Sequence, residues 1–249
     1  MLVSRQFRLN RSKTLRFLDE LATPASEGIT VYIPPTPSQE QAQALLEKVP
    51  GAGGLPPDVP GLVSGSKTGA VLFWGPLAKY LVVPPFPVTE KYLTSGYDAG
   101  LLASMLKQEV TVALVLVRLG AYAVGVSRGE KLIASKVGTG LVHGRHRQGG
   151  SSAARFQRRR DDQIDHFLDR VCEHALEKIQ PHANEVDYIV YGGAWTTILS
   201  LQKQCPFLRG FGDRALGPLL DIPKPNQATL ESALERVWSC RITEWKEET

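Results

Sequence analysis

One stretch of the chain, HGRHRQGGSSAARFQRRRDD (residues 143–162), combines a Gly-Gly step, two serines and six arginines. Two adjacent glycines permit positive φ and let the main chain approach a surface that side chains would obstruct. The amide N–H that follows them, that of Ser151, could donate a hydrogen bond to an oxyanion. The same glycines also suit a simple turn, so the Gly-Gly step alone leaves a catalytic and a structural interpretation open.

Positive charge is concentrated around this step. Residues 131–160 contain two lysines, six arginines and no acidic residue, whereas the whole chain has a net charge of only +4. Outside this block the chain has 21 basic and 25 acidic residues, because eight of its 29 basic residues lie inside it. Charge that is segregated in this way indicates a polyanionic partner.

The arginines favour RNA as that partner. On a helix, Arg155, Arg158 and Arg159 would share one face, because they are spaced i, i+3 and i+4. A guanidinium binds phosphate through two parallel hydrogen bonds and also stacks on bases. A solvated helix face beside an ordinary loop is the alternative, with Asp161 and Asp162 as helix-stabilising partners, for example Arg158 with Asp162. The predicted RNA-binding residues are Arg145, His146, Arg147, Arg155, Arg158, Arg159 and Arg160.

The elements around this stretch predict how it is held. Three β-type runs, TVALVLVRL, AYAVGVSRG and EKLIASKVG, are separated by turns at Gly120 and Gly129 and indicate a meander. Residues 153–180 contain no Gly or Pro and keep apolar side chains at helical spacing, which predicts a helix of roughly 40 Å. We therefore expect residues 138–152 to project as a basic loop between a strand and a long helix.

The rest of the chain predicts two domains of the α+β or α/β class. The first, residues 1–105, shows a helix near Ser12, a strand ITVYIPP, a helix capped by Ser38, and a strand pair TGAVLFWG and KYLVVPPFP. The second, residues 106–249, adds a strand VDYIVYGG and helices over 194–204 and 227–240 to the meander. A mixed β-sheet flanked by helices is the expected architecture of the second domain.

Other chemistry finds little support in the sequence. Cys172, Cys205 and Cys240 are far apart and have no histidines at metal-binding spacing, so we expect ordinary thiols of a reducing compartment and no metal or cofactor. The segment GLVSGSKT has Ser66 where a phosphate-binding loop needs its second glycine, and no nucleotide is expected. The most apolar run is interrupted by Arg118 and Gly120, so we expect a cytoplasmic protein without a membrane span.

The segment HGRHRQGGSSAARFQRRRDDQIDHFLDRV resembles the catalytic loop and following helix in the middle domain of archaeal and eukaryotic class I release factors. In that family a basic stretch precedes Gly-Gly-Gln-Ser-Ala-x-Arg-Phe, and the three β runs and the later strand also agree. Similarity before residue 108 is weaker. The positions that match the motif are Gly149, Gly150, Ser152, Ala153, Arg155 and Phe156.

Two departures make the chain more similar to the smaller Vms-like (ANKZF-type) release-factor relatives. It lacks the third domain that recruits a GTPase and the Thr-Ala-Ser-Asn-Ile-Lys-Ser motif associated with stop-codon reading. The resemblance implies peptidyl-tRNA hydrolysis in ribosome quality control, with the large ribosomal subunit, its peptidyl-transferase centre and peptidyl-tRNA as partners.

A third departure concerns catalysis. Ser151 stands where the release-factor motif has glutamine, and Ser152 stands where the Vms-type motif has it. Two expectations therefore remain open: a hydrolase that works through the main chain of the loop, and a ribosome-binding rescue or surveillance factor that leaves the ester intact. The candidate catalytic residues are Gln148, Gly149, Gly150, Ser151 and Ser152.

Overall fold

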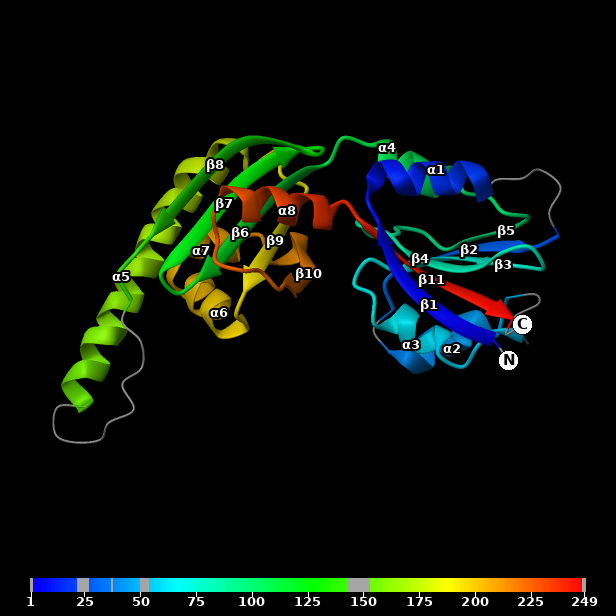
Figure 1. Ribbon diagram of the computed structural model, residues 1–249, viewed down its shortest axis with the longest axis horizontal. Coiled ribbons are helices and arrows are strands. Elements are labelled where there is room, and N and C mark those ends of the chain that lie inside the picture. The colour runs from blue at the N-terminus through cyan, green and yellow to red at the C-terminus, as the bar shows by residue number, and fades with distance from the viewer. Residues whose placement is uncertain (1, 22–26, 37, 50–53, 143–152, 248–249) are drawn as a thin grey trace. The chain divides into compact units, whose positions relative to one another are not determined.

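A computed structural model describes residues 2–21, 27–36, 38–49, 54–142 and 153–247 (Figure 1). The chain divides into two compact units. The first unit comprises residues 1–108 together with 236–249, and the second comprises residues 109–235. Each unit contains one β-sheet with helices packed on it, which confirms the predicted mixed α and β class.

The first unit is built on a six-stranded sheet with helices on both faces. Helices α1 (Arg11–Leu21) and α4 (Gly100–Lys107) bury Leu18, Leu102 and Leu106 on one face. Helices α2 (Gln39–Leu46) and α3 (Val59–Ser64) cover the other face. The strands, in spatial order, are β1 (Leu2–Leu9), β11 (Cys240–Glu247), β4 (Lys79–Val83), β3 (Ala70–Trp74), β2 (Ile29–Ile33) and β5 (Tyr92–Ser95).

Local sequence signals in the first unit are largely confirmed. The Ser38 side chain caps α2 by accepting a hydrogen bond from the Gln41 amide, and the predicted strand pair forms as antiparallel β3 and β4. Helix α1 begins near Ser12 as predicted, and its cap is Asn10, because the Asn10 carboxamide oxygen accepts a hydrogen bond from the Lys13 N–H at 3.0 Å. Asparagine is as effective an N-cap as serine.

The second unit contains the predicted mixed sheet. Strands β6, β7 and β8 form an antiparallel meander, whereas β9 and β10 extend the sheet in parallel beside β6. Every residue of β6 except the last is buried, as its apolar sequence predicts. The strands, in spatial order, are β10 (Ala215–Leu220), β9 (Tyr188–Gly193), β6 (Thr111–Arg118), β7 (Ala121–Arg128) and β8 (Lys131–Thr139).

Helix α5 (Ala153–Ile179) packs along one face of this sheet. Phe167, Leu168, Val171 and Ala175 lie in the same core cluster as the β7 side chains that include Val124, as the helical spacing predicts. The other helices of the unit are α6 (Trp195–Gln204), α7 (Pro206–Arg209) and α8 (Gln227–Val237), the last of which extends into the first unit.

The predicted end of the second domain is wrong. Residues 106–249 do not form one unit, because β11 lies between β1 and β4 in the sheet of the first unit. All eight residues of β11 pair with β1, and the predicted final helix over 227–240 ends at Val237 so that this strand can form. The first unit therefore contains both ends of the chain.

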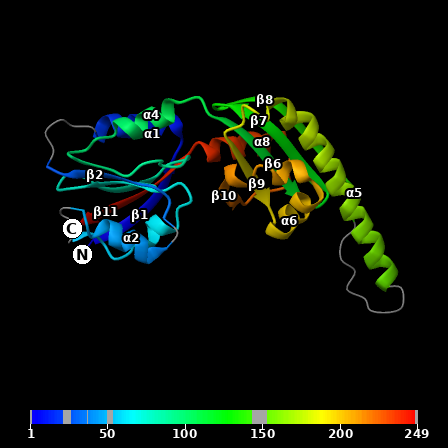
Figure 2. The same cartoon turned by 180° about the vertical axis from the view of Figure 1, so that it is seen from behind.

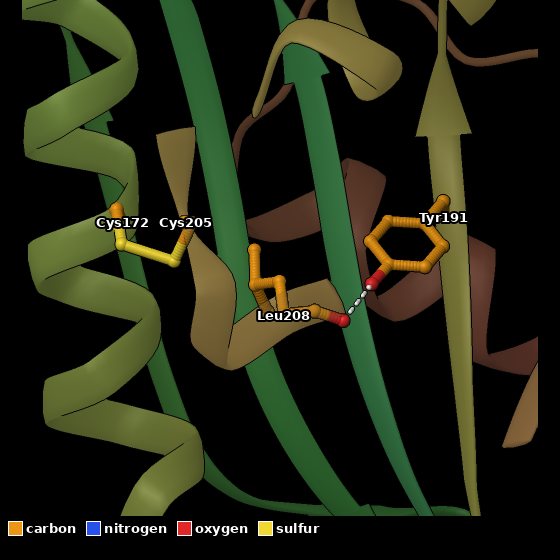
Figure 3. The surroundings of a disulfide bond; sticks show 4 residues. All are labelled: Cys172, Tyr191, Cys205 and Leu208. Atoms are coloured by element: carbon orange, nitrogen blue, oxygen red, sulfur yellow. Dashed lines mark hydrogen bonds between the residues drawn. A yellow bond between two sulfur atoms is a disulfide. The ribbon is translucent and has the colours of Figure 1, made fainter. Parts of the chain in front are cut away.

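The expectation of three ordinary thiols is also wrong. Cys172 on α5 and Cys205, which follows α6, form a disulfide with their Cα atoms 5.6 Å apart (Figure 3). The pairing depends on the packing of α5 against α6 and α7. The separation of the two cysteines by 33 residues in the sequence does not reveal this packing. Cys240 is a free, buried thiol, and its burial raises its pKa to about 12.

Thiol titration tests this cysteine arrangement. We expect no reactive thiol in the native oxidised protein, one after unfolding without reductant, and three after unfolding with reductant. Reduction removes the constraint on a loop of 33 residues and should lower the free energy of unfolding by about 4 kcal/mol. The Cys172→Ser/Cys205→Ser variant should unfold like the reduced protein. Three thiols without reductant would contradict the pairing.

Candidate nucleic-acid interface

The first part of α5 extends beyond the sheet. The helix first contacts the apolar core at Ile164, and the last residue of β8, Thr139, accepts a hydrogen bond from Arg170 at 3.3 Å. Residues 153–163 precede these contacts and correspond to about 16 Å of helix. Figure 1 shows this segment passing the end of the sheet. We refer to residues 153–163 as the α5 arm.

Exposed arginines cover the arm. Arg155, Arg158 and Arg159 are exposed, and Arg160 is partly exposed. Within the part of the chain that the structure describes, the first three form no ion pair. The predicted partnership of Arg158 with Asp162 is not formed, whereas Asp161 accepts a hydrogen bond from Gln157 at 2.8 Å. These three guanidiniums are therefore available to an anionic ligand.

The remaining predicted site residues belong to the segment 143–152. Ser152 directly precedes the arm in the sequence, and residues 143–152 lie outside the described ranges. The predictions for these positions therefore stay predictions. They concern Arg145, His146, Arg147, Gln148, Gly149, Gly150, Ser151 and Ser152.

A close approach of strand and helix holds the base of the arm. A Cβ atom on Gly140 would lie 2.6 Å from the Phe167 ring, and one on Gly138 would lie 2.3 Å from the Tyr122 hydroxyl oxygen. Tyr122 in turn packs edge-on against Phe167 and stacks on His174, with ring centroids 6.0 and 5.6 Å apart. The glycines thus permit the aromatic contacts that fix α5 on the sheet.

Sequence reasoning missed these supporting residues. The Gly-Thr-Gly run at 138–140 was predicted as part of the loop, although Gly138 and Thr139 belong to β8. Two glycines spaced by one residue, just before a helix with an aromatic residue on its apolar face, are the signal that could have indicated the contact. Burial raises the pKa of Tyr122, as expected for a hydroxyl against an apolar helix face.

Helix α6 holds α5 from a second side. The disulfide joins the two segments covalently, and the Gln204 carboxamide donates to the Asp165 carboxylate at 3.3 Å. Tyr191 on β9 fastens α7 by donating a hydrogen bond to the Leu208 carbonyl at 3.1 Å (Figure 3). The arm therefore extends from a helix that is fixed both to the sheet and to its neighbouring helices.

Two other kinds of site find no support in the described part of the chain. No group of three or more His, Cys, Asp or Glu side chains there could hold a metal ion. None of the helices described combines the length and apolarity that a membrane crossing requires.

The sequence of this chain also matches the model of a known protein family. The model of the Actinobacteria/chloroflexi VLRF1 release factor family matches residues 110–243, more than half of the chain. The chain belongs to this family. The matched segment contains all of the second unit except Glu109, and therefore its whole sheet together with α5 and the arm. The relationship to release factors that the loop and helix residues predict is thereby confirmed.

Individual relatives of this chain are named peptide chain release factor subunit 1. That of Archaeoglobus fulgidus is 30% identical over 109 residues, which cover 44% of this chain and 27% of the relative. That of Thermococcus sibiricus is 28% identical over 144 residues, which cover 53% of this chain and 35% of the relative. That of Picrophilus torridus is 24% identical over 253 residues, which cover 90% of this chain and 61% of the relative. The chain thus spans about a quarter to a third of the length of the first two relatives.

Two solved structures are also similar to this chain. Archaeal translation termination factor aRF1 is 17% identical, with a TM-score of 0.41, and the match covers 92% of this chain and 73% of that one. Archaeoglobus fulgidus Pelota is 12% identical, with a TM-score of 0.30, over 85% and 63% of the two chains.

Neutralising the arm tests its role in RNA binding. The Arg155→Gln/Arg158→Gln/Arg159→Gln variant should bind RNA more weakly, and the slope of log affinity against log salt should fall by about 2 to 3. Titrations of large-subunit RNA between 50 and 300 mM salt, roughly the range in which counterion release dominates, measure both effects.

The matched control is Lys13→Gln/Arg16→Gln/Lys107→Gln, which removes the same charge from exposed positions of the first unit. If both triple variants weaken binding equally, net charge rather than the arm accounts for the affinity.

Proposed function

We propose that this chain is a peptidyl-tRNA hydrolase that acts on stalled ribosomes or free large subunits in the cytoplasm, without reading a stop codon. The observation that carries the proposal is the match of residues 110–243 to a release-factor family, together with a long helix that presents the exposed guanidiniums of Arg155, Arg158 and Arg159 shortly after the Gly-Gly step in the sequence. The large subunit and peptidyl-tRNA are the proposed partners. We also propose that the activity requires no metal, cofactor or nucleotide.

We propose that different residues bind the RNA and insert the loop. Arg155, Arg158, Arg159 and Arg160 hold ribosomal RNA and the end of the tRNA from the arm, and Arg145, His146 and Arg147 add contacts from the loop. The helix N-terminus adds partial positive charge at the same place. The two glycines let the loop enter the peptidyl-transferase centre with its main chain exposed.

The proposed reaction is hydrolysis of an activated ester. A water molecule attacks the carbonyl carbon that joins the peptide to the tRNA ribose, and a tetrahedral oxyanion forms. The ribose oxygen then leaves with a proton, and the peptide keeps the new carboxyl group. The ribosome protects this ester chiefly by excluding water, so a factor needs only to admit and orient one water and to stabilise the oxyanion.

The loop offers several groups for these two tasks. The Ser151 N–H is the proposed oxyanion donor, and the hydroxyl of Ser151 or Ser152, or the Gln148 carboxamide, holds the water. One preorganised donor contributes about 3 kcal/mol to lowering the barrier, or roughly a hundredfold in rate. A main-chain donor keeps that contribution when serine replaces glutamine.

Hydrolysis of peptidyl-tRNA on isolated large subunits tests the proposal. Gly150→Ala should lower the single-turnover rate by about a hundredfold, because a side chain at this position moves the following N–H away from the oxyanion. Gly212→Ala is the matched control, since a Cβ atom there meets nothing within 4 Å. Release by the wild type no faster than spontaneous hydrolysis would contradict the function.

A non-hydrolytic ribosome-binding factor is the second candidate, and the serine at position 151 favours it. The Ser151→Gln variant separates the two functions. For a hydrolase we expect its release rate to equal or exceed that of the wild type, because the added carboxamide can also orient water. Tight subunit binding without release by either protein would instead support the second candidate.

A further inference from the structure

Helix α6 presents a ridge of two apolar side chains and one lysine to solvent. The Trp195 side chain is 62% exposed and that of Leu199, one turn later, is 43% exposed. Lys203, one turn further, is also exposed, whereas Thr197, Ile198 and Leu201 on the opposite side are buried. We refer to Trp195, Leu199 and Lys203 as the α6 ridge. Its residues are spaced i, i+4 and i+8 and so lie along one side of the helix.

Trp195 differs from every other tryptophan of the chain. Trp74, Trp238 and Trp245 are at most 8% exposed and belong to the first unit. Within the described residues Trp195 makes no aromatic or cation–π contact. A large indole that the fold leaves in water, next to an exposed leucine, marks a contact surface rather than a packing position.

The charge around the ridge points to the kind of partner. Residues 188–212 contain no acidic residue, and the exposed cations Lys203 and Arg209 follow Trp195 along α6 and α7. The carboxylate of Asp165 contacts α6 at Gln204, which lies on a different side of the helix from Trp195. An exposed aromatic ring with cations, and without an acidic residue on its own helix, suits single-stranded RNA, whose bases stack and whose phosphates need positive charge.

The fold places the ridge at the same end of the sheet as the α5 arm. Helix α6 begins at the carboxyl end of β9, which is parallel to β6, and β8 ends at that edge too because it is antiparallel to β7. Figures 1 and 2, from opposite sides, both show α6 at the end from which the arm extends. The arm and the ridge can therefore contact one RNA surface.

Two constraints fix the ridge relative to the arm. Gly193, just before α6, has φ of +122°, and a Cβ atom there would lie 1.9 Å from the Val117 carbonyl oxygen, so the helix start is held tightly against β6. The disulfide from Cys205 holds the helix end to α5. Arm and ridge thus belong to one rigid unit.

We propose that the α6 ridge is a second RNA-contact surface, on which Trp195 stacks against an unpaired base and Lys203, with Arg209, binds the neighbouring phosphates. The proposal deepens the proposed function, because it adds a stacking contact to the electrostatic contact of the arm. Electrostatic contacts to phosphates do not read the bases, whereas the indole requires an accessible base. The ridge therefore directs the chain to a place where a base is unpaired.

Tryptophan fluorescence and affinity test the proposal with deproteinised large-subunit RNA as the probe. RNA should quench the wild-type emission, and Trp195→Phe should abolish the change, because the other tryptophans are buried. Trp195→Leu should bind this RNA about 5- to 150-fold more weakly, the range expected for one lost base stack, whereas Trp195→Phe should stay near the wild type. Thermal unfolding of each variant confirms the fold.

Two outcomes would overturn the proposal. Equal affinity of Trp195→Leu and the wild type for the RNA excludes a stacking role. Weaker binding of Trp195→Leu to intact subunits, together with unchanged binding to deproteinised RNA, assigns the ridge to a protein partner.

The same variants separate this inference from the proposed function. A wild type that shows Trp195-dependent RNA binding but releases no peptide contradicts only the hydrolase. A Trp195→Leu protein that binds RNA and releases peptide like the wild type contradicts only the ridge.

Discussion

The packing of α5 on β7 and β8 is the interaction on which the rest of the second unit depends. The rings of Tyr122 and Phe167 pack against each other in the space that side chains at Gly138 and Gly140 would otherwise occupy, and the disulfide from Cys172 holds the opposite side of the helix. Because the helix is fixed from Ile164 onward, its first turns can extend into solvent without losing their direction. A basic segment that must enter an RNA cavity needs such a rigid support, since ordering a flexible one would cost conformational entropy at binding.

Different parts of this unit supply its stability and its positive charge. The sheet and the buried side of α5 are apolar and supply stability, whereas the arm carries three exposed arginines, Arg155, Arg158 and Arg159, that form no ion pair with any carboxylate among the described residues. A release factor of the VLRF1 family acting on RNA would benefit from this arrangement. In the proposed function, long-range attraction would bring the chain to the polyanion, and the rigid helix would then set the direction of approach.

Much of this architecture could be predicted from the sequence, because the relevant signals are local. The meander, the long helix and β9 follow from apolar periodicity and from the glycines and prolines that separate them. The β1–β11 pair could not be predicted, since it joins the two ends of the chain and its side chains, such as Arg5 and Glu244, are charged. The disulfide and the exposure of Trp195 depend on which helices become neighbours, and periodicity does not contain that information.

A cryo-electron microscopy map of the protein bound to large ribosomal subunits that carry peptidyl-tRNA is the most direct measurement of the central claim, that a rigid arm delivers the loop. The account predicts that the first turns of α5 contact ribosomal RNA and that residues 148–152 lie within about 4 Å of the ester, the reach of a reacting group and its hydrogen bonds. A map in which the arm points into solvent, while another surface of the chain holds the subunit, would contradict it.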